Sequence, residues 1–184
     1  ALNSSMESIT NKLSSSRSRH FKIRAGDLGR QLSLASTLIA AGIDTPVLKV
    51  KIDGFDTHEN QSWRHQRLLE NLGRALSGFA QQMQKIGQWD NTLVLTYSEF
   101  GRRAVENSTN GTDHGTAAPH FLSGGAINGG IYGKHPSLSA LIDGDMQFTM
   151  DYRSVYEWIL SQWFEIEKNR FSQYRTAKLN SLMT

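Results

Sequence analysis

Residues 65–86 carry a hydrophobic repeat that is typical of one long amphipathic helix. Apolar side chains recur there every three or four residues, and the repeat stops at Gly87. A second repeat runs from Asp27, a candidate N-cap, to Gly42, a candidate C-terminal cap. We therefore predict helices over 27–42 and 65–86. The long repeat comprises His65, Leu68, Leu69, Leu72, Ala75, Leu76, Phe79, Met83 and Ile86.

Short apolar runs alternate with these helices and are typical of strands. Residues 46–52 place Leu48, Val50 and Ile52 on one face, and residues 92–97 form a compact run rich in β-formers. A strand, a helix and a second strand in this order predict a right-handed parallel crossover. We predict a further strand at 120–122 and a last helix around 155–163, capped near Thr149 or Asp151. The predicted fold class is α/β, with a mostly parallel sheet flanked by helices.

The bulk properties are those of a chain with one folded domain. We expect a polar helix or connector over residues 1–24 and one α/β domain over residues 25–184. No apolar run approaches the roughly 20 residues of a membrane span, so no membrane-spanning segment is predicted. The net charge of +3 comes mostly from scattered Lys and Arg, which favours a solvated surface and no nucleic-acid partner. The absence of cysteine excludes disulfides and thiolate chemistry.

The chain begins with Ala1 and contains no export signal, so we expect a processed or truncated product. A truncated α/β sheet would expose an edge strand or apolar surface. We therefore expect either a homo-oligomer or a missing N-terminal half that completes the sheet.

Three polar clusters lie where predicted strands run out into loops. Strand ends are where α/β sheets present their ligands, and carboxylates and imidazoles are the side chains that a hydrolytic divalent metal needs. The clusters are Gly54-Phe55-Asp56-Thr57-His58, Ser98-Glu99-Phe100-Gly101-Arg102 and Gly111-Thr112-Asp113-His114-Gly115. They predict a dispersed metal site whose candidate ligands are Asp56, His58, Glu99, Asp113 and His114.

Structural explanations compete with metal binding for these candidates. Asp56 and His58 alternate on an extended or turning segment, but an Asx-turn beside a surface histidine gives the same residues. Glu99 closes an apolar strand, where its charge needs a metal, a cation or solvent, and Arg102 offers an ion pair instead of a metal. Arg102 and Arg103 are also candidates for holding an anionic substrate group.

With further short motifs, these clusters resemble a bacterial family known as domain of unknown function 1501, within the alkaline phosphatase-like and sulfatase-like superfamily. The resemblance extends roughly from residue 27 to residue 163. It implies an alkaline phosphatase-like α/β fold of which this chain is the C-terminal portion. The further motifs are Leu38-Ile39-Ala40-Ala41-Gly42, Gly129-Gly130-Ile131-Tyr132-Gly133 and Asp151-Tyr152-Arg153-Ser154-Val155-Tyr156.

The resemblance implies a metal-dependent hydrolase of phosphate or sulfate esters. Asp56 and His58 look like ligands of one zinc, manganese or magnesium ion, and His114 looks like the histidine that completes its shell. Glu99 takes the place of an aspartate that follows a strand. Phe100 departs from the Asp-His-Gly pattern of metal phosphatases and cannot ligate a second metal.

The resemblance also bears on substrate, nucleophile and location. It implies an anionic small molecule or a glycan as substrate, and it implies that the nucleophile lies outside this chain. Export of family members implies a periplasmic or extracellular location. The alternative function is a non-catalytic module with a degenerate metal site, which would bind a glycan or a partner protein.

Overall fold

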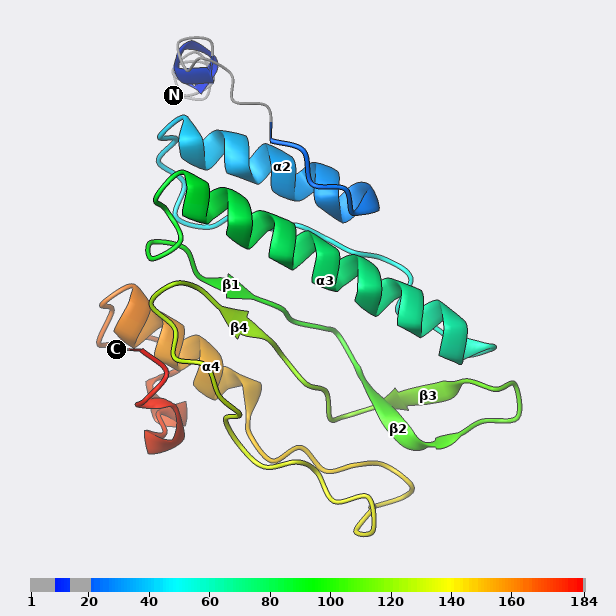
Figure 1. Cartoon of the computed structure of the whole chain (residues 1–184). Coiled ribbons are helices and arrows are strands. Elements are labelled where there is room, and N and C mark those ends of the chain that lie inside the picture. Colours follow the sequence, from blue (N-terminus) through cyan, green and yellow to red (C-terminus); the bar gives the residue numbers. More distant parts are fainter. Residues whose placement is uncertain (1–8, 14–20, 184) are drawn as a thin grey trace. The chain divides into compact units, whose positions relative to one another are not determined.

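The computed structural model describes residues 9–13 and 21–183 of the chain (Figure 1). It divides into two compact units, unit 1 over Ala1–Thr92 and unit 2 over Leu93–Thr184, and each is described by itself. Within the predicted connector over 1–24, residues 9–13 are helical and residues 21–24 lead into the first long helix. The remainder of that prediction lies outside the described residues.

Unit 1 is built on two helices, α2 over Gly26–Ala40 and α3 over Gln61–Lys85, which pack side by side (Figure 1). Both helices were predicted from their repeats, and the buried residues follow those repeats. None of the described helices has the length and apolar character needed to cross a membrane, in agreement with the prediction. The buried apolar residues of the pair are Leu28, Leu32 and Ala35 on α2, and Ala75, Phe79 and Met83 on α3.

The segment 46–52 between these helices is extended but pairs with no strand in the described part of the chain, so the predicted strand is wrong. The side-chain amide of Gln31 takes the place of a neighbouring strand at one residue. Its Oε1 accepts a hydrogen bond from Lys51 N at 2.9 Å, and its Nε2 donates to Lys51 O at 2.8 Å. The alternating apolar pattern of 46–52 therefore belongs to an extended segment whose backbone hydrogen-bonds to a helix side chain at Lys51.

Unit 2 contains two small antiparallel sheets. Strand β1 (Val94–Leu95) pairs with β4 (Leu122–Ser123), and β2 (Gly101–Glu106) pairs with β3 (Thr112–Gly115). These are the only sheets among the described residues, so the predicted mostly parallel sheet, its parallel crossover and the α/β fold class are wrong. Strands β1 and β4 are only two residues long, and so short an apolar run does not specify the partner or the direction of a strand.

The C-terminal part of unit 2 is helical. Helix α4 (Tyr152–Trp158) continues as a π-helical turn η1 (Ile159–Trp163), and two 3-10 turns follow, η2 (Ser172–Tyr174) and η3 (Ala177–Leu179). Trp158 packs with Leu179 and Leu182 in the hydrophobic core of this unit. The predicted last helix is confirmed, and Asp151 is its N-cap.

Asp151, the N-cap of α4, also forms an ion pair with Arg153. Asp151 Oδ1 accepts hydrogen bonds from Arg153 N at 2.9 Å and from Arg153 Nε at 2.8 Å. The Arg153 guanidinium in turn lies over the Tyr174 ring at 4.1 Å and links the helix start to η2. The side-chain hydrogen bond from Arg153 lowers the pKa of Asp151 below its ordinary value of 3.8.

This lowered pKa predicts a pH-dependent contribution to stability. Because the unfolded state binds the proton more readily, the contribution is complete above about pH 5 and is lost as the pH falls through the lowered pKa. We expect Asp151→Asn, which keeps a capping side chain, to reduce the unfolding free energy at pH 7 and to shrink the loss between pH 7 and pH 3. Urea titrations of both proteins at the two pH values measure this difference, and equal losses would contradict it.

Candidate functional site

The first predicted cluster forms an anchored loop in unit 1. Thr57 is buried, and its backbone N donates to Phe55 O at 2.9 Å. Phe55 contacts the ring of His65 edge to face, with centroids 5.6 Å apart. Residues 55 and 57 thus fasten the loop, while the alternate residues Asp56 and His58 remain exposed.

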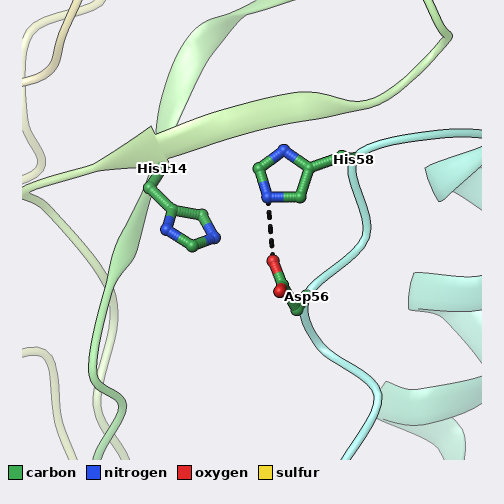
Figure 2. A group of neighbouring side chains, drawn as sticks. All are labelled: Asp56, His58 and His114. Atoms are coloured by element: carbon green, nitrogen blue, oxygen red, sulfur yellow. Dashed lines mark ion pairs between the residues drawn. The ribbon is translucent and has the colours of Figure 1, made fainter.

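Asp56 and His58 form an ion pair across the turn, with 2.8 Å between His58 Nε2 and Asp56 Oδ1. Figure 2 shows this pair as a dashed line and also draws the imidazole of His114, which belongs to β3. The carboxylate is 63% exposed and the imidazole 45% exposed. A carboxylate that accepts from one ring nitrogen fixes the tautomer and the orientation of the imidazole, an arrangement common at metal-binding histidines.

The second and third clusters are the two strands of one hairpin in unit 2. Gly101 pairs with Gly115, and Arg102 pairs with His114. Asn107 closes the connecting turn, because its Oδ1 accepts from the backbone N of Thr109 and of Gly111, both at 3.0 Å. The stretch 101–118 is therefore mostly a β-hairpin.

The histidine of the third cluster takes part in an aromatic stack. The rings of Phe100 and His114 lie 3.8 Å apart between centroids and within 7° of parallel. The guanidinium of Arg102 lies over the Phe100 ring, 5.1 Å from its centroid, and Arg102 also donates through Nη1 to Thr112 O. The stack was missed by sequence reasoning, although the Asn110-Gly111 dipeptide is a known signal for a hairpin turn.

Backbone packing leaves no room for a side chain at either glycine of the hairpin pair. A Cβ at Gly101 would lie 2.1 Å from Ala117 O, and one at Gly115 would lie 2.5 Å from Asp145 Oδ1. Asp145 also accepts through Oδ2 from Thr116 N at 3.0 Å. The two glycines in the predicted metal motifs thus serve the close packing of the hairpin.

The remaining candidate residues, Asp113, Glu99 and Arg103, are all exposed. Asp113 is exposed, accepts from Asn107 Nδ2 at 3.3 Å, and as the strand neighbour of His114 points to the opposite face of the hairpin. Glu99 is exposed in the bend that precedes β2. Arg103 is exposed and donates through Nη1 to Asp143 O at 3.3 Å.

Each unit carries exposed side chains that can bind a metal ion. Asp56 and His58 of unit 1 offer a carboxylate oxygen and an imidazole nitrogen, and His114 of unit 2 offers a second imidazole nitrogen. Imidazole nitrogens and carboxylate oxygens are ligands that suit zinc and related divalent metals.

Comparison with known proteins identifies the family of this chain. No curated protein and no solved structure matches the chain. A family described as "Protein of unknown function (DUF1501)" matches residues 5–153, a range that includes all three clusters. The chain belongs to this DUF1501 family.

Proposed function

We propose that the chain binds a divalent metal ion through Asp56 and His58, with His114 as the further ligand that the family resemblance implies, and serves the hydrolysis of phosphate or sulfate esters. The observation that carries the proposal is the Asp56–His58 pair, held at 2.8 Å on a loop whose intervening residue is buried. Such a loop presents two ligand types at a fixed spacing, which reduces the conformational entropy that metal binding would cost. The resemblance to the alkaline phosphatase-like superfamily supports the same reaction class.

The proposed roles follow from the chemistry of each group. A bound divalent ion supplies Lewis-acid polarisation of a phosphoryl or sulfuryl oxygen. Of the two arginine candidates, Arg102 lies on the same face of the hairpin as His114 and is the one proposed to donate to an anionic group of the substrate, whereas Arg103 points to the opposite face. The nucleophile would come from a residue outside this chain.

A second candidate function is a non-catalytic module that binds a single metal. Phe100 favours it, because this ring occupies the motif position of a ligand in two-metal phosphatases and here stacks on His114. Metal-dependent turnover separates the candidates, since a bound ion that confers hydrolysis supports the hydrolase, whereas a single bound ion that confers no hydrolysis supports the binding module.

Metal binding can be tested on the chain purified without chelator. We expect about one equivalent of zinc, manganese or magnesium by plasma mass spectrometry. We expect His58→Ala and His114→Ala to weaken Zn²⁺ binding more than about 100-fold in calorimetry, because loss of a mere orienting partner already costs 10–100-fold. His135→Ala, which removes an exposed histidine outside the clusters, is the matched control and should bind normally.

Hydrolysis of 4-nitrophenyl phosphate and sulfate, with and without metal, by the longer protein that supplies the nucleophile then tests the reaction class. Metal-dependent turnover that His114→Ala abolishes would support the hydrolase. Absence of metal from the wild-type chain would overturn the proposed site. Wild-type Zn²⁺ affinity in the His58→Ala and His114→Ala variants would also overturn it.

A further inference from the structure

The face of the β2–β3 hairpin that carries His114 is set by strand geometry. Cross-strand partners share a face of an antiparallel pair, so Arg102 and His114 lie on one face. Side chains two residues apart in an extended segment also share a face, which places Phe100 there. Phe100 is therefore a diagonal neighbour of His114, at a separation that aromatic side chains can bridge.

The contact between these two rings is unusually well aligned. The centroids are 3.8 Å apart and the planes differ by 7°, so the Phe100 ring covers one face of the imidazole. Phe100 is itself half-buried and lies beneath the guanidinium of Arg102. Arg102 is held by its hydrogen bond to Thr112 O, on the same strand as His114.

We propose that Phe100 is a positioning residue for His114, and that it holds the imidazole in the orientation needed to bind a metal ion. The inference rests on the proposed function. A stacked ring leaves both imidazole nitrogens at the edge of the stack, where a lone pair can reach an ion. It also removes rotations about the side-chain bonds of an otherwise exposed histidine, and this ordering is then complete before the ion binds.

The proposal gives Phe100 a role other than that of a lost ligand. A phenylalanine in a motif that resembles Asp-His-Gly cannot bind a metal, but it can orient the histidine that does. Partners that orient metal-binding histidines typically change affinity 10–100-fold when they are removed. Phe100 would do by stacking what a carboxylate or carbonyl usually does by hydrogen bonding.

The test compares variants that keep or remove the stack. We expect Phe100→Leu, which keeps an apolar side chain, to weaken Zn²⁺ binding 10–100-fold in calorimetry, while Phe100→Tyr, which keeps the ring, retains wild-type affinity. Val105→Ala is the matched control, because it removes an exposed apolar side chain from the same hairpin. Proton NMR of the metal-free chain should show His114 ring protons shifted upfield in the wild type and in Phe100→Tyr, but not in Phe100→Leu.

The outcomes test the positioning role of Phe100 separately from the proposed metal site. If His114→Ala loses Zn²⁺ binding but Phe100→Leu binds as the wild type does, the positioning role is wrong and the proposed metal site stands. If the wild type binds no Zn²⁺, the proposed function fails and the positioning role fails with it. If Phe100→Tyr binds as weakly as Phe100→Leu while both keep wild-type unfolding midpoints, stacking is not what orients the histidine.

Discussion

Replacement of Gly101 by alanine is expected to lower the unfolding free energy of unit 2 by roughly 3 kcal/mol, at the upper end of the usual cost of overpacking. The added Cβ would lie 2.1 Å from the carbonyl oxygen of Ala117 and 2.8 Å from its backbone nitrogen. These atoms belong to the backbone that follows β3, so no side-chain rotation can relieve the clash. The hairpin must open at its first pair, Gly101 with Gly115.

Urea titration followed by circular dichroism measures this effect, with Gly129→Ala as the matched control. Gly129 also lies in unit 2, and a Cβ there would meet no atom within 4 Å. We expect the control to be neutral or slightly stabilising, because alanine reduces the entropy of the unfolded chain. Equal midpoints for the wild type and Gly101→Ala would show that the hairpin does not pack as described.

The second large effect concerns a buried carboxylate in α4. Glu157 is 3% exposed, and its Oε1 accepts from Arg175 Nε at 2.9 Å and from Arg175 Nη2 at 2.8 Å. Arg175→Met would leave this charge without its cation. We expect a loss of roughly 2 kcal/mol, below the about 3–5 kcal/mol of a fully buried pair, because the arginine side chain is itself 55% exposed.

A double-mutant cycle distinguishes loss of the ion pair from loss of packing. Glu157→Gln combined with Arg175→Met removes the charge together with its partner, so the double variant should be more stable than Arg175→Met alone. Urea midpoints of the four proteins supply the cycle. Additive changes would mean that the carboxylate does not depend on Arg175.

The helices of this chain could be predicted because their signals are local. The three-to-four spacing in α2 and α3 depends only on neighbours within each helix, and Asp151 caps α4 two residues before Arg153. Strand partners are not local. The run around β1 reads equally well as a buried parallel strand, but its partner is β4, which lies antiparallel and more than twenty residues away.

The candidate site likewise has a local part, which could be predicted from the sequence, and a non-local part, which could not. Asp56 and His58 lie two residues apart, so a close approach of their side chains was predictable from the sequence. The alignment of Phe100 with His114 was not, because it depends on the register of the hairpin. The clusters at 98–102 and 111–115 look like separate loops in the sequence, whereas the Asn107 turn makes them neighbouring strands.

The hairpin register also governs where members of this family can differ in length. A single insertion or deletion within β3 would turn His114 to the opposite face, away from Phe100, because side chains alternate along a strand. Extra residues between Asn107 and Gly111 would lengthen the turn and break the bond from Gly111 N to Asn107 Oδ1, but they would leave His114 on the same face of the hairpin. Gaps in alignments of relatives should therefore gather in this turn, and the spacing from Thr112 to Gly115 should be kept.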